Sequence, residues 1–309
     1  MKICSLLPSA TEILFALGLG DQVAGVSHEC DFPPEAQTRL VLVKSRISHT
    51  ESAAAIDRQV REFLERGESL YSVDLTALGA IEPDLIITQD LCHVCAATPD
   101  DLGAALAHLA CKPEVVTLNP HSLADVCAAI RAVGRATGRS EQASAAIAEF
   151  ERDIAHVERA VAGLPRPRVV CLEWLDPPYV AGHWVPEMVA RAGGIDALGR
   201  AGEPSFRVEW EAILAAQPEV IVIMPCGYAL SQVAKEFRDL TLPDAWHDMP
   251  AGRTGRVFLV EASGYFSRPG PRLAAGVAIL ADAIHEGQLA SLTPSGAGLV
   301  LARVANSEA

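Results

Sequence analysis

The sequence predicts an α/β protein made of two Rossmann-like lobes that are joined by a long α-helix. The first observation is an internal repeat, in which residues 73–87 match residues 208–222 at a spacing of 135 residues. The second is that each copy reads as a short helix, a proline that ends it, and a continuous apolar strand typical of a buried parallel sheet. The third is segment 141–162, whose apolar residues recur at helical spacing among charges and predict one helix of roughly 30 Å.

The remaining elements follow from the same patterns. Ser9, with Glu12 three residues later, has the spacing of a capping box, so we expect the first helix to begin just after Ser9. In chain order, we expect a strand at 2–7, a helix at 10–17, strands at 22–27, 85–89 and 114–118, the long helix, strands at 167–172, 219–224 and 256–260, and a helix at 271–285. These elements give an N-terminal lobe at 1–118, linking helices at 119–164, a C-terminal lobe at 165–285 and a loosely ordered tail at 286–309.

Composition excludes several function classes. The 309 residues carry a formal net charge of −14, which repels phosphate backbones and anionic lipid surfaces and so argues against a nucleic-acid partner. We find no apolar run of the roughly 18 to 20 residues that a membrane span needs, so we expect no membrane insertion and a cytoplasmic chain. Eight cysteines in a chain of this size do not predict a disulfide framework. A small molecule or a protein remains as the expected partner.

Two loops that follow predicted strands carry side chains suited to a metal. Ligands of open α/β sheets bind outside the carboxyl ends of the strands. The metal-ligand candidates there are His28, Cys30, Cys92, His93 and Cys95. Thiolate and imidazole together suit zinc, iron or cobalt. Two alternatives stay open. In the first, these are reduced loop residues whose hydrogen bonds are made locally; in the second, the C-x-x-C pair belongs to a thiol-dependent enzyme.

Aromatic side chains gather in the loops of the second lobe. Aromatic walls favour a flat or bulky, partly apolar ligand. The candidate ligand-binding residues are Pro8, Ser9, His28, Glu29, Cys92 and His93 in the first lobe, and Glu173, Trp174, Trp184, Tyr265, Phe266 and Arg268 in the second. We find none of the G-x-S-x-G, Walker, G-x-G-x-x-G or H-E-x-x-H motifs, so we expect no catalytic residues and no enzyme.

Several of these segments together resemble a known family. They are Pro8-Ser9-x-Thr11-Glu12, Ser27 to Asp31, Thr88 to Cys95, Cys171 to Pro178 and Tyr265 to Arg272, together with the repeat and the long helix. Over about residues 1–285 the chain resembles the periplasmic-binding-protein family with a rigid interlobe helix, and within it a branch usually called cobalamin-binding. The resemblance implies a carrier, store or transporter-associated protein. Its interlobe cleft would take a bulky metal-bearing molecule, with cobalamin or a related corrinoid first, and a metal ion or haem as the alternative.

The sequence departs from the family pattern at one of the positions where family members contact their transporter. Family members have a glutamate seven residues before the repeat proline in each lobe, and this glutamate docks onto transporter arginines. Here Glu211 occupies that position in the second copy, but Thr76 occupies it in the first. Because one docking residue is missing and the sequence starts at the first strand, we expect an intracellular carrier, store or sensor.

Overall fold

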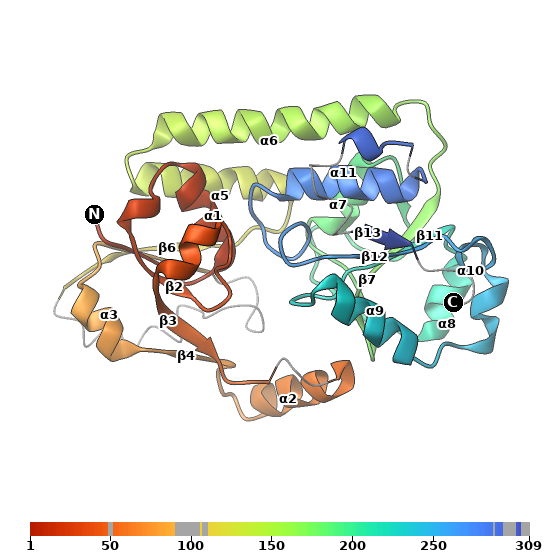
Figure 1. Cartoon of the computed structure of the whole chain (residues 1–309), viewed down its shortest axis with the longest axis horizontal. Helices are drawn as coiled ribbons and strands as arrows, with labels where there is room; N and C mark the ends of the chain where they lie inside the picture. The colour runs from red at the N-terminus through yellow and green to blue at the C-terminus, as the bar shows by residue number, and fades with distance from the viewer. Residues whose placement is uncertain (49–51, 90–105, 107–110, 287, 293–300, 304–309) are drawn as a thin grey trace. The chain divides into compact units, whose positions relative to one another are not determined.

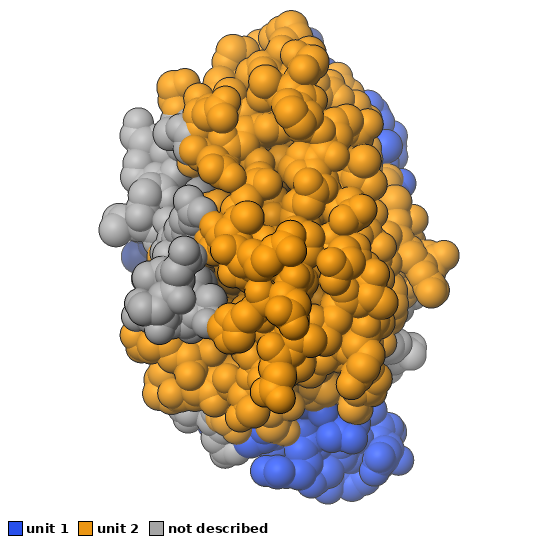
Figure 2. Space-filling model, turned by 90° about the vertical axis from the view of Figure 1, so that its right-hand side faces the viewer, with its two compact units in different colours: residues 1–51, 55–120, 124–148 blue, residues 52–54, 121–123, 149–309 orange. Residues whose placement is uncertain are grey.

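The computed structural model describes residues 1–48, 52–89, 106, 111–286, 288–292 and 301–303. Its contacts divide the chain into two compact units, coloured separately in Figure 2. Unit 1 comprises residues 1–51, 55–120 and 124–148, and unit 2 comprises 52–54, 121–123 and 149–309. Each unit is built around its own sheet (Figure 1), and α6 (Ser140–Val161) runs unbroken from the end of unit 1 into unit 2. The predicted fold class and the long helix are confirmed.

Unit 1 contains a six-stranded sheet in the order β4-β3-β2-β1-β5-β6. The strands are β1 (Ile3–Ser5), β2 (Val23–Ser27), β3 (Leu40–Ser45), β4 (Tyr71–Val73), β5 (Leu85–Gln89) and β6 (Glu114–Leu118), and only β4 pairs antiparallel. The helices are α1 (Pro8–Ala16), α2 (Ala53–Glu65), α3 (Leu75–Ile81) and α5 (Leu123–Ala136), with short 3₁₀ turns at Gly20–Gln22 and Pro34–Thr38. A buried cluster that includes Cys4, Leu42, Leu78 and Ile86 forms part of the core.

Unit 2 contains a sheet in the order β10-β8-β7-β11-β12-β13, with β9 also paired to β7. Its strands are β7 (Arg168–Leu175), β8 (Pro178–Val180), β9 (Ile195–Asp196), β10 (Phe206–Arg207), β11 (Val220–Ile223), β12 (Val257–Val260) and β13 (Leu301–Arg303). Its helices are α7 (Val185–Arg191), α8 (Trp210–Ala216), α9 (Leu230–Asp239), α10 (Pro250–Thr254) and α11 (Leu273–Ile284), with 3₁₀ turns at Asp244–Asp248 and Ala290–Leu292. Helices α7 and α11 pack together over one face of the sheet, and α9 lies across the opposite face (Figure 1).

The structure corrects two local predictions. The capping box is wrong, because α1 begins at Pro8 with Leu7 as its N-cap, so Ser9 and Glu12 lie inside the helix and are buried. A proline at the first helical position starts the helix earlier, since its fixed φ suits a helix and its missing N–H needs no partner. Strand β7 extends to Leu175, so Trp174 belongs to a strand rather than to a loop.

None of the helices in the described part of the chain is both long and apolar enough to cross a membrane.

Candidate functional site

Polar side chains are buried where the strands of unit 1 end. Strand β1 lies between β2 and β5, and all three run parallel, so their carboxyl ends meet at one edge of the sheet. The buried polar residues of unit 1 are Ser5, Ser9, Thr11, Glu12, Ser27, Thr88 and Gln89. They lie at these strand ends or in α1, which follows β1 directly. Because ligands of open α/β sheets bind outside the carboxyl ends of the strands, this edge is the candidate ligand face of unit 1.

Cys30 is packed into this polar edge. The Thr11 hydroxyl lies 3.1 Å from Sγ of Cys30 and 2.8 Å from Oγ of Ser5. Only 3% of Cys30 is exposed. The structure therefore brings this predicted metal ligand against the hydroxyl groups of α1 and β1.

His28 lies at the same edge with both ring nitrogens near protein oxygens. Its Nδ1 is 3.2 Å from the carbonyl oxygen of Val43, and its Nε2 is 3.4 Å from Oε1 of Glu29. The His28 side chain is 27% exposed and that of Glu29 is 33% exposed. Both predicted residues can thus be reached from solvent, unlike Cys30.

The predicted metal cluster is only partly described. Cys92, His93 and Cys95 lie outside the described residues. Among the residues that the structure does describe, no group of three or more His, Cys, Asp or Glu side chains is gathered as a metal site would require. The five-residue cluster stays a prediction.

An aromatic pair follows the central strands of unit 2. Trp174, near the end of β7, lies with its ring centroid 5.3 Å from that of Tyr228, in the loop after β11. Trp174 is half-buried and Tyr228 is buried. Burial, with a smaller contribution from Glu236, raises the pKa of Tyr228 to about 12, so its phenol is neutral at physiological pH. Sequence reasoning missed Tyr228, although its position just after a buried parallel strand was the signal that could have found it.

Trp184 and Phe266, also predicted to line the ligand site, are buried and pack within unit 2. The indole N–H of Trp184 donates a hydrogen bond of 2.7 Å to the carbonyl oxygen of Phe266. Only 4% of Trp184 and 2% of Phe266 are exposed. Trp184, expected in a loop with its ring open to a ligand, is instead the buried N-cap residue of α7. This pair therefore fixes the loop after β12 to the start of α7.

The other predicted residues of unit 2 lie near the strand ends. Glu173 is half-buried in β7, and Arg268 is 8% exposed in the loop after β12. Tyr265 is half-buried, and the guanidinium carbon of Arg272 lies 5.6 Å from the centroid of its ring. In unit 1, Pro8 is half-buried and Ser9 is buried, both in the first turn of α1.

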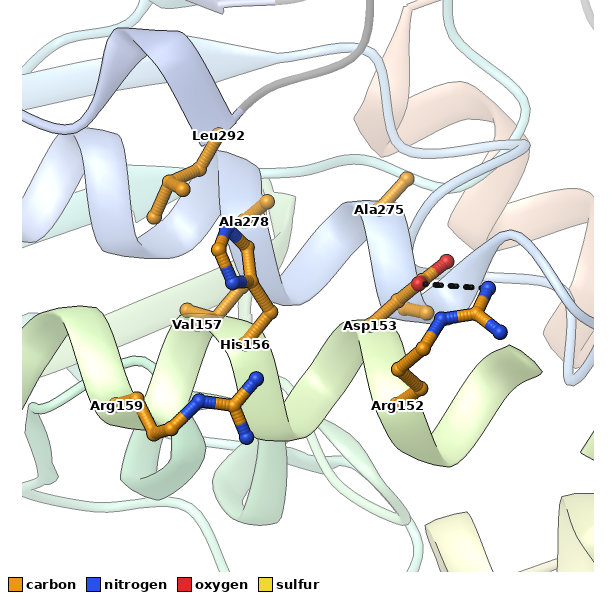
Figure 3. Close-up of a pocket in the computed structure, with 9 residues that line it drawn as sticks. Arg152, Asp153, His156, Val157, Arg159, Ala275, Ala278 and Leu292 are labelled. Atoms are coloured by element: carbon orange, nitrogen blue, oxygen red, sulfur yellow. Dashed lines mark hydrogen bonds and ion pairs between the residues drawn. The ribbon is translucent and has the colours of Figure 1, made fainter. Parts of the chain in front are cut away.

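A cavity of about 370 Å³ lies elsewhere in unit 2, between α6 and α11 (Figure 3). It is lined by Arg152, Asp153, His156, Val157 and Arg159 of α6, by Ala274, Ala275 and Ala278 of α11, and by Leu292. Arg152 forms an ion pair of 3.4 Å with Asp153 beside it. The cavity lies on helix faces rather than at strand ends, and it contains none of the predicted site residues.

Comparisons with known proteins agree with this architecture. The model of a family described as periplasmic binding protein matches residues 3–263. The vitamin B12-binding protein of Vibrio cholerae is 24% identical over 275 residues, which cover 88% of this chain and 84% of that protein. An uncharacterized ABC transporter substrate-binding lipoprotein of Bacillus subtilis is 26% identical over 297 residues, covering 92% of this chain and 80% of that protein. The solved apo structure of a periplasmic heme-binding protein from Roseiflexus has a TM-score of 0.69 at 25% identity, covering 93% of this chain and 98% of that one.

The predicted cytoplasmic location is wrong. The matching family is periplasmic, and the relatives include a lipoprotein that binds substrate for an ABC transporter. The prediction rested on the lack of an apolar run long enough to span a membrane and on where the sequence begins, and neither observation fixes the location of a protein. The expected intracellular role is therefore wrong as well. The family and the relatives consist of substrate-binding proteins, and the chain is not an enzyme, as predicted.

Proposed function

This chain belongs to the periplasmic binding protein family, and from that premise we propose that it binds a cobalamin-type corrinoid and delivers it to an ABC transporter. Relatives of similar length are named as vitamin B12-binding proteins, and a structural neighbour is named as heme-binding. A bulky ligand with a metal at its centre is common to both. The choice of a corrinoid over haem rests on the side chains at the strand ends.

The observation that carries the proposal is the Trp174–Tyr228 pair. The indole of Trp174 is half-buried, rests against the ring of Tyr228 and donates its N–H to the carbonyl oxygen of Ala53 at 3.3 Å, so its aromatic face is the part left for a ligand. A corrin ring presents the matching chemistry, since its flat macrocycle is surrounded by neutral amide side chains. We therefore assign Trp174 to the wall that the ligand contacts in unit 2, with the buried Tyr228 supporting its ring.

Charge favours a corrinoid over haem. Haem carries two carboxylates, whereas the amides of a corrinoid are neutral. The chain has a net charge of −14, and a surface of that sign disfavours an anionic ligand unless cations compensate. Arg268 is the one arginine or lysine among the proposed ligand residues, and a single guanidinium does not neutralise the two carboxylates of haem.

We assign the other predicted residues to two roles. Ligand contacts fall to Pro8, Ser9, His28, Glu29, Cys92 and His93 in unit 1 and to Glu173, Tyr265 and Arg268 in unit 2, while Trp184 and Phe266 support the loop after β12. Among the described metal-ligand candidates, His28 is the better donor to the cobalt of the ligand. Its side chain is 27% exposed, whereas Cys30 is buried.

The test is ligand titration of the purified full chain. Hydroxocobalamin and haemin are added separately, and bound ligand is measured by visible absorbance after gel filtration. We expect stoichiometric binding of hydroxocobalamin. Trp174→Ala should weaken that binding by about 1 to 3 kcal/mol, the range for an aromatic residue central to a binding surface. Binding of haemin alone, or unchanged hydroxocobalamin affinity in a folded Trp174→Ala variant, contradicts the proposal.

Trp210→Leu is the matched control. Trp210 is also a tryptophan of unit 2, but it lies in α8 with its ring centroid 6.0 Å from that of Trp246, edge to face. Its replacement should lower stability and leave hydroxocobalamin affinity unchanged. If His28 ligates cobalt, His28→Ala should change the visible absorbance spectrum of the bound corrinoid. An identical spectrum would mean that His28 is not a ligand of the cobalt and that packing contacts hold the corrin ring.

Delivery to a transporter depends on exposed residues in the first turns of α3 and α8. Glu211 is exposed at the second position of α8, and Thr76 is exposed at the second position of α3. We propose that Glu211 carries the docking interaction in unit 2. Glu211→Lys should abolish uptake in cells that depend on this protein for corrinoid, without changing ligand affinity, whereas Thr76→Lys should reduce uptake much less. Equal effects of the two substitutions would contradict this assignment.

A further inference from the structure

Two histidine rings lie close together in unit 2, and neither histidine is one of the metal ligands predicted above. His121 follows β6 in the chain, His183 precedes α7, and both belong to unit 2. Their ring centroids are 5.5 Å apart, and the ring planes are inclined by 41°. We propose that His121 and His183 form a binding site for a borderline transition-metal ion, of the class of Zn²⁺ or Cu²⁺, with open coordination positions.

The separation of the rings fits a shared ion. With metal–nitrogen bonds of about 2.0 to 2.1 Å, each ring centroid lies roughly 3.2 Å from the ion, so two imidazoles at a tetrahedral angle have centroids roughly 5 Å apart. The observed separation of 5.5 Å is close to that value. The separation of the rings is therefore compatible with both imidazoles ligating one ion.

The backbone holds His183 in an unusual conformation. Its φ is 52°, in the left-handed region that few side chains other than Asn, Asp and His adopt. The N–H of His183 donates to the carbonyl oxygen of Glu203 at 2.6 Å, and its carbonyl oxygen accepts from the N–H of Gly202 at 2.9 Å. Residues held in such conformations by their surroundings concentrate at functional sites.

Neighbouring rings fix the plane of the His183 imidazole. The Trp184 indole stacks on it at 5.5 Å with an interplanar angle of 30°, and this indole is itself hydrogen-bonded to Phe266. A ligand whose ring plane and backbone are both fixed is preorganised for a metal, because little conformational freedom is lost on binding.

The chemical state of His183 suits a metal ligand. Its Nε2 atom is buried and meets no hydrogen-bond partner among the described residues. Burial, with a smaller contribution from His121, lowers the pKa of His183. Neutral imidazole is the form that binds zinc and copper.

His285 is a matched control within the same unit. Burial also lowers the pKa of His285, but its Nε2 lies 3.2 Å from the carbonyl oxygen of Ala192, so this nitrogen already has a partner. No ring contact of His285 with a second imidazole is present among the described residues.

The test is equilibrium dialysis of the full chain against Zn²⁺ at pH 7.5, with no corrinoid present. The variants are His183→Asn, which tolerates the left-handed backbone, His121→Asn, and His285→Asn as control. We expect His183→Asn and His121→Asn each to bind one zinc ion fewer than the wild type, or to bind it at least tenfold more weakly, while His285→Asn binds as the wild type does. Zinc should raise the melting temperature of the wild type and of His285→Asn, and raise it less in the other two.

Two results would overturn the proposal. One is the same zinc stoichiometry and affinity in His121→Asn and His183→Asn as in the wild type. The other is an equal loss in His285→Asn, which would mean that the loss reflects general disturbance of unit 2. If His183→Asn does not fold, the comparison of His121→Asn with His285→Asn decides alone. Zinc binding by the wild type should also weaken as the pH falls, because protons compete with the metal ion for its ligands.

Discussion

The two copies of the internal repeat share the same backbone details in different units. In unit 1, α3 ends at Glu82 with φ of 51° and leads into β5, and in unit 2, α8 ends at Gln217 with φ of 46° and leads into β11. Both strands are buried along their whole length. The repeat seen in the sequence is therefore a repeated structural unit, down to the left-handed residue that ends each helix.

A similar clasp ties the end of each helix to the start of a strand in the sheet of its own unit, β1 or β7. The Lys2 ammonium donates to the carbonyl oxygen of Ile81, the last residue of α3, at 2.8 Å, and the Arg168 guanidinium donates to that of Gln217, the residue after α8, at 2.8 Å. The backbone N–H of Lys2 donates to the Asp84 carboxylate at 2.7 Å, as that of Arg168 does to Glu219 at 2.9 Å. Side chains of the same charge, rather than identical residues, preserve this clasp.

The copies differ where their helices begin. Asp74 is the N-cap of α3 and accepts a hydrogen bond of 2.9 Å from the N–H of Ala77. Glu209, the N-cap of α8, makes no side-chain cap. In the first turns, Thr76 of α3 corresponds to Glu211 of α8. The comparison teaches that the fold constrains the end of the repeat helix in both units, whereas the start of the helix differs between them.

The largest effect on stability should come from substitutions in the buried strand that both copies of the repeat contain. Ile86 of β5 and Ile221 of β11 occupy equivalent positions, and both are 0% exposed. Replacing either by alanine should lower the free energy of unfolding by about 3 kcal/mol, the usual cost of a large-to-small change in a core.

The two units can be followed separately in that experiment. All four tryptophans lie between residues 174 and 246, so tryptophan fluorescence during urea unfolding reports on unit 2, and hydrogen exchange of β5 reports on unit 1. A cost below about 1 kcal/mol in one copy would contradict the equivalence of the two strands.

A smaller effect on stability should distinguish the N-terminus of α3 from that of α8. Asp74→Ala removes the cap of α3 and should cost about 1 kcal/mol. Glu209→Ala removes no cap and should change stability by no more than a few tenths of a kcal/mol. Hydrogen exchange of the first turns of α3 and α8 would measure both, and equal losses in the two helices would show that the N-cap difference has no energetic meaning.

Prediction from sequence was accurate where the pattern is long. The buried runs at β5 and β11 and the charge pattern of α6 each extend over enough residues to specify one type of structure. Strands such as β9 and β10 contain two residues each, which carry no periodicity, so pattern reasoning could not find them. Strand β13 was missed because a three-residue strand in a segment rich in Gly and Ser depends on its pairing with β12 rather than on its own composition.

The candidate site was less predictable, because loop position does not tell which way a side chain points. Trp174 and Trp184 looked equivalent in the sequence, yet Trp184 is buried with its N–H bonded to Phe266, while Trp174 is half-buried beside Tyr228. Likewise His28 and Cys30 are two residues apart and differ in exposure, because Cys30 turns in toward Thr11. Such differences depend on tertiary contacts that no local pattern encodes.

The smallest predicted effect tests the residues that end the repeat helices. A side chain at positive φ costs free energy that glycine avoids, although glycine also loses more conformational entropy on folding. Glu82→Gly should therefore stabilise the protein slightly, by about 0.5 kcal/mol. At Gln217 the same change removes a hydrogen bond of 2.8 Å from the side-chain amide to the carbonyl oxygen of Leu214. Since such a bond contributes about 0.5 to 1.5 kcal/mol, Gln217→Gly should be neutral or slightly destabilising. Urea unfolding of both variants measures the difference in sign, and Glu82→Ala, which keeps the Cβ atom, should give no gain. Stabilisation of equal size at both positions would mean that the Gln217 side chain contributes nothing and that the two helix ends are energetically the same.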